Sequence, residues 1–180
     1  MKQKLLFLLL SPFLASCLGY PESVKPVSGF QIQNYLGEWY EIARLDHKFE
    51  RGLDNVTAVY SLRDDGGVKV QNRGYSEKKD EWKEAVGRGY FVEQQDVGYL
   101  KVSFFGPFFG SYVIFELDDR EYAFVCGSST SYLWLLSRKP TVSEQIKKKF
   151  ITKIEQLGFD SKKLIWVSQV KNDANLGKSQ

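Results

Sequence analysis

The side chains best suited to chemistry in this chain are two cysteines, Cys17 and Cys126, and a single histidine, His47. A zinc site usually takes about four ligands, so one histidine and one thiol are too few to build one. Cys126 ends the apolar run Tyr-Ala-Phe-Val-Cys and has no basic neighbour that would make its thiol reactive. We therefore interpret Cys126 as a small buried hydrophobe. These residues predict no catalytic site, no metal site and no cofactor, and they favour a binding protein over an enzyme.

Cys17 ends a segment with the layout of a secretion signal. Lysines at positions 2 and 4 give a basic start, residues 5–14 form an apolar stretch, and Leu14-Ala15-Ser16-Cys17 supplies small residues for a cleavage site. A transmembrane helix needs about 20 apolar residues, and this stretch is shorter and is interrupted by a serine and a proline. We expect residues 1–16 to be removed as a signal peptide.

The residues Leu-Ala-Ser-Cys also resemble the lipobox of bacterial lipoproteins, and this resemblance implies that Cys17 carries a lipid at the mature N-terminus. Leu18, rather than an aspartate, follows the cysteine, which resembles the pattern for sorting to the outer membrane. A single acyl chain anchors weakly, whereas several chains hold a protein firmly on a bilayer. The sequence therefore predicts lipid anchoring at the bacterial outer membrane. An ordinary cleaved signal with an incidental cysteine is the alternative.

Composition indicates that the mature chain is one nearly neutral domain. The full sequence has a formal net charge of +3, and loss of the two lysines of the signal lowers it by two, to +1. A domain with so little charge has no electrostatic footprint for nucleic acid, so nucleic acid is not expected as a partner. With Cys17 lipidated, Cys126 has no partner for a disulfide. The fold must then be held together by packing and hydrogen bonds.

Short runs of β-branched and aromatic residues, separated by turn residues at intervals of about 8–12 positions, predict a series of β-strands. The Asp-Gly pair at positions 65–66 is a strong hairpin signal between two of these runs. The predicted strands cover residues 38–45, 55–62, 68–74, 82–92, 98–105, 111–117, 121–127 and 132–138. Consecutive strands with mostly short connections indicate an antiparallel meander.

The pattern then changes from strands to a helix. Thr141 is predicted as the N-cap, with Glu144 reaching back to it in a capping box. Apolar residues at positions 146, 150, 154 and 157 follow at helical spacing, and Gly158 suits the C-terminal cap. The lysines at 147–149 are interpreted as the solvated face of this helix rather than as a site for nucleic acid or lipid head groups. A ninth strand is predicted over residues 164–170.

Consecutive antiparallel strands without a disulfide favour a closed barrel, because closure removes the unpaired edges of a sheet. A barrel of about eight strands has room inside for side chains or for one small ligand. Alternation along the strands predicts which side chains point inward. They are Val56, Ala58, Tyr60 and Leu62 in the second strand, Val68, Val70 and Asn72 in the third, and Tyr132, Trp134, Leu136 and Arg138 in the eighth. Such a wall suits an amphiphile better than a sugar or a nucleotide.

Three short motifs resemble those of the lipocalins and occur in the order of that family. They are Gly37-Glu38-Trp39 at the first strand, Asp118-Asp119-Arg120-Glu121-Tyr122 between the sixth and seventh strands, and Ser137-Arg138 at the end of the eighth. The runs Trp-Tyr-Glu-Ile-Ala-Arg from position 39 and Phe-Phe-Gly-Pro from position 104 are similar to the bacterial lipocalins, outer-membrane lipoproteins that resemble apolipoprotein D. The resemblance implies an all-β fold, an eight-stranded antiparallel up-and-down lipocalin barrel with one C-terminal α-helix and a ninth strand.

The resemblance also implies roles for individual residues. Gly37, Trp39 and Arg138 are expected to close one end of the barrel, with the guanidinium stacked on the indole in a purely structural role. Of the inward-facing residues, Tyr60, Asn72 and Trp134 match pocket positions of apolipoprotein D-like members. The predicted ligand-binding residues are Tyr60, Asn72, Trp134, Tyr132, Leu136 and Val70. Core filling without a ligand is the alternative role for these side chains.

Together these features predict a membrane-anchored lipocalin that binds and stores or transports long-chain fatty acids, lysophospholipids or phospholipids in the cell envelope. Its partners would be one such ligand and the outer membrane, and a homodimer is left open. The alternative is a structural or envelope-stress lipoprotein with a filled barrel. A haem site at His47 and a lipocalin-type thiol enzyme built on Cys126 are weaker alternatives. The predicted organisation is a signal at 1–16, a lipidated N-terminus and tether at 17–28, a lipocalin domain at 29–170 and a polar tail at 171–180.

Overall fold

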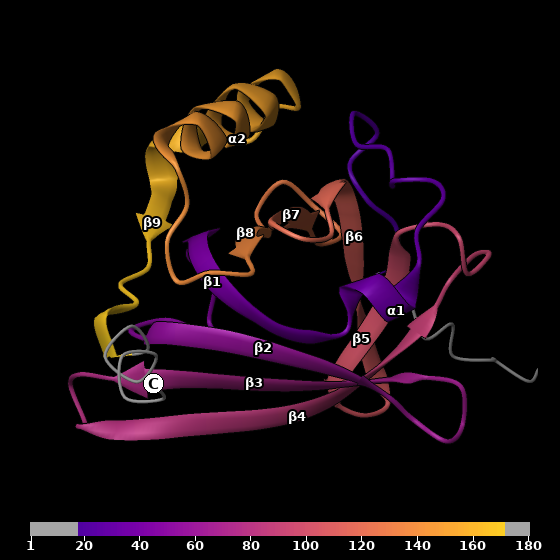
Figure 1. The fold of residues 1–180 in the computed structure, drawn as a ribbon, viewed down its shortest axis with the longest axis horizontal. Helices are drawn as coiled ribbons and strands as arrows, with labels where there is room; N and C mark the ends of the chain where they lie inside the picture. Colours follow the sequence, from indigo (N-terminus) through magenta and orange to yellow (C-terminus); the bar gives the residue numbers. More distant parts are fainter. Residues whose placement is uncertain (1–17, 172–180) are drawn as a thin grey trace, which may run out of the picture.

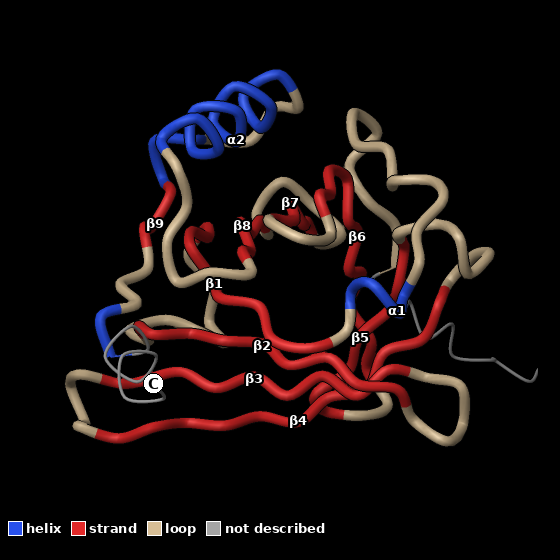
Figure 2. The backbone as a smooth tube through the Cα atoms, viewed as in Figure 1, coloured by secondary structure: helices blue, strands red, loops and turns tan. Residues whose placement is uncertain are grey.

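The computed structural model describes residues 18–171, so the predicted signal, the predicted lipid attachment at Cys17 and the tail beyond Lys171 lie outside the described residues. A strongly curved sheet closes on itself, and one long helix lies outside it (Figures 1 and 2). In chain order the elements are α1 (Ile32–Tyr35), β1 (Gly37–Leu45), β2 (Asp54–Leu62), β3 (Val68–Ser76), β4 (Glu81–Phe91), β5 (Tyr99–Phe105), β6 (Phe108–Asp118), β7 (Tyr122–Cys126), β8 (Leu133–Ser137), α2 (Glu144–Gln156), η1 (Ser161–Lys163) and β9 (Leu164–Trp166).

Strands β1 to β8 form a closed antiparallel barrel. From β2 to β8 each strand pairs with the next along the chain, and β1 closes the ring by pairing with both β8 and β2. β9 pairs with the last residues of β1, from Ala43 to Leu45. The predicted fold class is confirmed: an eight-stranded up-and-down barrel with one long helix after it and a ninth strand.

The two strands that close the ring, β1 and β2, pair only over the first four residues of β1. Further along, β9 is the neighbour of β1 as far as Trp166. Beyond Trp166 the side-chain amide of Gln169 bridges the gap, donating to the carbonyl oxygens of Glu41 at 2.7 Å and Val56 at 3.0 Å. The predicted ninth strand, 164–170, is therefore too long: after a last backbone bond from Val167 to the carbonyl oxygen of Ile42, the regular pairing with β1 ends and the Gln169 side chain joins β1 and β2.

Several other predicted boundaries differ by one to three residues, and the structure explains two of them. Helix α2 begins at Glu144 with Ser143 as its N-cap, and the Ser143 hydroxyl accepts a hydrogen bond from a backbone N–H of the first turn. Ser143 directly precedes the helix, so its hydroxyl, and not that of Thr141, reaches this free N–H. Strand β6 begins at Phe108 rather than at 111, because Phe108 pairs with Phe105 across a register shift in the β5–β6 hairpin.

Apolar side chains form two separate clusters, one outside the barrel wall and one inside it. The outer cluster packs α2 onto the barrel through Ile146, Phe150 and Ile154. The inner cluster includes Trp39 and Tyr60, whose rings both contact Tyr35 of α1. Fully burying a large apolar side chain stabilises a fold by about 1.5–3 kcal/mol, so both clusters hold the barrel wall in place.

The connections between strands alternate between the two ends of the barrel. Helix α1 precedes the start of β1 and shares one end with the β2–β3, β4–β5 and β6–β7 connections; we call this the closed end. The opposite end carries the β1–β2 loop and the β3–β4, β5–β6 and β7–β8 connections, and we call it the open end. Side chains pointing inward between the two ends line the barrel interior.

The stretch predicted as an extended tether packs against the outside of the barrel instead. The backbone N–H of Gly19 donates to the phenolic oxygen of Tyr99 at 2.7 Å, and the Ser23 hydroxyl donates to the carbonyl oxygen of Leu157 at 2.7 Å. Val24 is only 1% exposed. Apolar burial and specific hydrogen bonds therefore fix this segment, which places the beginning of the described chain beside β5.

Candidate ligand-binding site

The closed end is built around Trp39 and Arg138, as the sequence predicts. The guanidinium carbon of Arg138 lies 3.8 Å from the centre of the Trp39 ring system. Gly37 begins β1 with a φ of +90°, a left-handed backbone conformation that favours glycine. The guanidinium donates at 2.6–3.1 Å to the carbonyl oxygens of Asn34, Leu36, Glu38 and Asp119. Main-chain oxygens therefore compensate the desolvation of this cation.

Three tyrosine hydroxyls are linked across the interior next to the closed end. The Tyr112 hydroxyl oxygen lies 2.6 Å from that of Tyr35 and 2.8 Å from that of Tyr60. Tyr60 on β2 and Tyr112 on β6 come from opposite sides of the ring, and Tyr35 comes from α1. Burial raises the pKa of all three phenols, so they stay neutral. We call this group the tyrosine floor; it contains Tyr60, one of the predicted ligand-binding residues.

Four other predicted ligand-binding residues line the wall around and beyond the tyrosine floor, with Val70 level with Tyr60 as its register partner. Val70 and Leu136 are 4% exposed and belong to the inner cluster, and Trp134 packs against it. Asn72 pairs in register with Ala58 of the inner cluster, so it faces the same side. The buried Asn72 Oδ1 has no hydrogen-bond partner within residues 18–171. An amide oxygen in this state can accept a hydrogen bond from a bound ligand.

Two residues predicted on the inner face of strands lie elsewhere. Leu62, the last residue of β2, is 53% exposed beside the β2–β3 turn, where the strand leaves the barrel wall. Tyr132 precedes β8 and lies in the β7–β8 loop at the open end. Its ring centre is 6.0 Å from that of His47 and 6.4 Å from that of Trp134. Leu62 therefore does not line the interior, whereas Tyr132 stands at the mouth.

A group of charged residues occupies the inner wall toward the open end. Arg44 is 2% exposed, and its Nη1 donates to the Glu41 carboxyl at 2.6 Å. Its Nη2 donates to the carbonyl oxygens of Glu50 and Leu53 at 3.0 Å each, which fastens the β1–β2 loop to the wall. Burying an unpaired charge is costly, so these contacts are what allow Arg44 to lie inside. We define the inner acid–base cluster as Glu41, Arg44, His47, Glu50 and Trp134.

Glu50 joins the β1–β2 loop to β8. Its Oε2 accepts a hydrogen bond from the Trp134 indole at 3.0 Å and lies 2.9 Å from the His47 Nε2. Burial, with Glu50 next to it, raises the pKa of Glu41 well above its ordinary value. Burial also acts to raise the pKa of Glu50, but contacts with His47 and Trp134 outweigh it and lower that pKa. Burial thus disfavours the charged form of Glu41, although Glu41 is the carboxyl that pairs with Arg44, whereas the Glu50 carboxylate is held by His47 and Trp134.

Sequence reasoning missed Glu41, Arg44 and Glu50, although the sequence does contain a signal for Glu41. Glu41 has the same parity as Trp39 on β1, and a glutamate on an inward-facing apolar strand needs a partner. Arg44 lacks that parity, because a register shift between Glu41 and Ala43 turns it inward. No residue pattern marked this bulge, so alternation alone could not find the pair.

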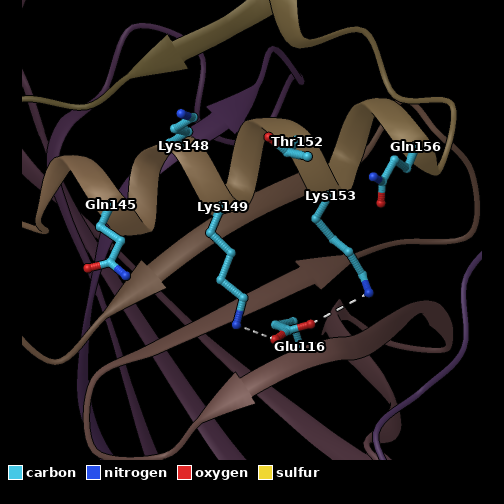
Figure 3. A pocket seen from close by; sticks show the side chains of 7 residues that line it. All are labelled: Glu116, Gln145, Lys148, Lys149, Thr152, Lys153 and Gln156. Atoms are coloured by element: carbon cyan, nitrogen blue, oxygen red, sulfur yellow. Dashed lines mark ion pairs between the residues drawn. The ribbon is translucent and has the colours of Figure 1, made fainter.

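A separate hollow lies outside the barrel, between α2 and β6 (Figure 3). Lys149 and Lys153 of α2 both reach toward Glu116 of β6, with N–O distances of 2.6 and 3.6 Å. Lys147 pairs with Glu144 at 2.6 Å on the same helix. These ion pairs within the chain balance much of the lysine charge, and we assign no ligand to this hollow.

Cys126 and His47 lie on different faces of the barrel wall. Cys126 is fully buried in the outer cluster, and burial raises the pKa of its thiol to about 12. A thiol in this state is not a nucleophile at neutral pH. His47 belongs to the inner acid–base cluster, where it contacts Glu50 and Trp134. The two residues therefore do not form a catalytic pair.

An up-and-down barrel that is closed at one end by a glycine, a tryptophan and a stacked arginine defines the lipocalin class of ligand-binding proteins. Residues 30–169 match the family described as the lipocalin-like domain, and the chain belongs to this family. Within residues 18–171, no helix is both long enough and apolar enough to cross a membrane.

Relatives narrow the class to a particular branch. Outer membrane lipoprotein Blc of Vibrio cholerae is 63% identical over 167 residues, covering 91% of this chain and 98% of that protein. Apolipoprotein D of Rattus norvegicus is 30% identical over 133 residues, 68% of each chain. The solved structure of insecticyanin from Manduca sexta matches with a TM-score of 0.68 and 21% identity, over 83% of this chain and 86% of that one. The predicted membership of the bacterial lipocalins and the predicted outer-membrane localisation are confirmed.

Proposed function

We propose that the barrel binds one long-chain amphiphile, a fatty acid, a lysophospholipid or a phospholipid, and stores or transports it in the cell envelope. The observation that carries this proposal is the change of polarity along the inner wall. Val70, the register partner of Tyr60, and Leu136 make the wall apolar around the tyrosine floor, whereas the inner acid–base cluster makes it polar toward the open end. An acyl chain would lie against the apolar part, with its head group near Asn72 and the open end.

Binding in solution tests this proposal directly. Lipid-stripped protein would be examined by native mass spectrometry with palmitate, a lysophospholipid and a phospholipid, and a fluorescent fatty acid would be titrated in parallel. We expect one ligand per barrel and saturable binding that unlabelled lipid displaces. Absence of displaceable binding for all three classes would contradict the proposal.

One observation favours a second candidate, a structural or envelope-stress lipoprotein with a filled barrel. The tyrosine floor and the inner acid–base cluster place large side chains, including Tyr112 and Arg44, inside the barrel. The same titration separates the two candidates, because a filled barrel takes up no fluorescent fatty acid. Incubation of the pure protein with these lipids should also show no turnover, as expected for a binding protein with an inert thiol.

We further infer that Cys17 is acylated and begins the mature protein. The motif around Cys17 and the relationship to outer membrane lipoproteins support this assignment. Changing Cys17 to Ser should leave the protein uncleaved or release it from the membrane. A Cys17→Ser variant that is processed and still fractionates with the outer membrane would rule out this anchor.

A further inference from the structure

We propose that the rim of the open end sits on the bilayer that holds the protein's own lipid anchor, so that the barrel opens toward the membrane. The contact is made by Phe49, Phe105 and Phe108, which we call the aromatic rim. This inference goes beyond ligand binding: it depends on the outer-membrane location of the protein and not on what the barrel contains.

The aromatic rim consists of large apolar side chains that the fold leaves exposed. Phe49 and Phe105 are each 69% exposed and Phe108 is 72% exposed. Phe49 belongs to the β1–β2 loop, and Phe105 and Phe108 flank the turn of the β5–β6 hairpin. Both connections are at the open end. Large apolar side chains gathered at one end of a protein indicate a surface that something covers.

The two aromatic connections face each other across the mouth. In the ring, two strands separate the β1–β2 hairpin from the β5–β6 hairpin on either side. The connections between them are polar, with Glu-Lys-Lys-Asp at 77–80 and Gly-Ser-Ser-Thr-Ser at 127–131. Apolar contacts on opposite sides of a ring define a plane over the mouth. A flat bilayer can cover both contacts at once, which a single helix or strand of a partner protein would not.

Cationic side chains accompany both parts of the aromatic rim. Arg88 and Lys101 lie 5.7 and 5.4 Å from the ring of Phe109, the residue after Phe108. The exposed Lys48 precedes Phe49 in the other connection. Aromatic residues with basic neighbours are favoured where a protein meets a lipid surface, because the cations reach phosphate groups while the rings enter the apolar layer.

The segment that leads to the anchor lies on the same hairpin. Gly19 is hydrogen-bonded to Tyr99, the first residue of β5, and the N–H of Val27 donates to the carbonyl oxygen of Ile114 on β6 at 2.9 Å. Phe105 is the last residue of β5. Tyr99 begins β5 at the closed end and Phe105 ends it at the open end, so Gly19 is fixed on the outside of this hairpin and away from the rim. Lipid on Cys17 would tether the protein beside the hairpin, and the aromatic rim itself would make the contact at the open end.

Site-specific fluorescence in reconstituted protein tests the proposal. Phe49→Cys and Phe108→Cys variants of the full lipidated protein would each carry an environment-sensitive label, since the lipid takes Cys17 and burial protects Cys126. The vesicles would contain phosphatidylethanolamine and phosphatidylglycerol, with or without brominated acyl chains. We expect both labels to shift to shorter wavelength on reconstitution and to be quenched by the brominated lipid.

Two exposed apolar residues away from the rim supply matched controls. Leu62 and Val86 are 53% and 56% exposed, and labels at Leu62→Cys and Val86→Cys should stay in water and unquenched. Rim labels that also stay in water, or quenching at only one of the two rim positions, would overturn the proposal. A wavelength shift that increases with the amount of protein per vesicle, without quenching by brominated lipid, would also overturn the proposal, because a second copy of the protein would then cover the rim. Ligand binding in solution does not depend on this contact, so its failure would be seen separately.

Discussion

The barrel has an arginine beside a tryptophan at its closed end and another on its inner wall toward the open end, and the two arginines are stabilised in different ways. At the closed end, Arg138 lies on Trp39 and bonds to main-chain carbonyl oxygens. Toward the open end, Arg44 pairs in register with Trp134 and is balanced by carboxyl groups of the inner acid–base cluster. Carbonyl oxygens do not titrate, whereas carboxyls do. The contacts of Arg138 at the closed end therefore do not change with pH. Those of the inner acid–base cluster depend on protonation and on the conformation of the β1–β2 loop.

A third pair, on the outer surface, shows what burial adds. Arg73 lies 3.8 Å from the Trp82 ring system, the same distance as between Arg138 and Trp39. The Arg73 side chain is 43% exposed, however, and it also faces Glu84. Cation–π contacts at exposed sites are worth only about 0.5–1 kcal/mol. The contribution of the closed end to stability must therefore come from the burial of Trp39 and from the hydrogen bonds of Arg138 to the main chain.

The largest expected effect is a loss of stability when the closed end is disrupted. Trp39→Ala removes a fully buried indole beneath Arg138 and should lower the free energy of unfolding by about 3–5 kcal/mol. Trp82→Ala is the matched control and should cost about 1 kcal/mol, because its indole lies on the surface under an exposed arginine. Urea unfolding of both variants measures the difference. Equal losses would show that burial does not distinguish the two pairs.

The closed end was predictable because its determinants are short motifs. Gly37 and Trp39 are two residues apart, and Arg138 directly follows β8, so the family resemblance located all three. The barrel topology was likewise predictable, since alternation and turn residues mark each strand separately. Both kinds of signal are local, and the contacts that they imply require only that neighbouring strands pair.

The opposite wall was not predictable, because it depends on features without a residue pattern. A bulge turns Arg44 inward, and the β1–β2 loop folds so that Glu50 meets Trp134, 84 residues further along the chain. The Gln169 amide that bridges β1 and β2 is equally remote from its acceptors. Alternation along the strands did predict an aromatic inner wall, but which polar groups reach it is decided by loop conformation.

The next largest effect separates the two glutamates of the inner acid–base cluster. Glu50→Gln removes the carboxylate that faces His47 and accepts from Trp134, and should cost about 2–3 kcal/mol, as expected for hydrogen bonds to charged groups. Glu41→Gln should cost less, since burial disfavours the charged form of Glu41 and the amide oxygen can still accept from Arg44. Thermal and urea unfolding would compare them. A larger loss for Glu41→Gln would contradict this order.

A smaller effect appears as a pH dependence. The pKa of Glu41 is raised in the folded state, so its contribution to stability is present below the unfolded value of about 4.3 and is lost as the pH rises. The pKa of Glu50 is lowered, so its contribution is present above that value and is lost as the pH falls. The Glu41→Gln variant should therefore gain stability relative to the unmodified protein as the pH rises above about 4. Parallel curves for the two proteins over this range would contradict the assignment.

The smallest expected effect concerns the role of Trp134 in ligand binding. Its indole N–H is already bonded to Glu50, so the ligand can use only the flat apolar surface of the ring. Trp134→Ala removes that surface and should weaken fatty-acid binding by about tenfold, the equivalent of about 1.4 kcal/mol. Trp134→Phe keeps much of the surface, and it should leave the affinity within about threefold while costing about 1 kcal/mol of stability for the lost hydrogen bond. Fluorescent fatty-acid titrations and urea melts of both variants supply the two numbers. If Trp134→Phe loses as much affinity as Trp134→Ala, the indole N–H must contact the ligand, and Glu50 must then release it when lipid binds.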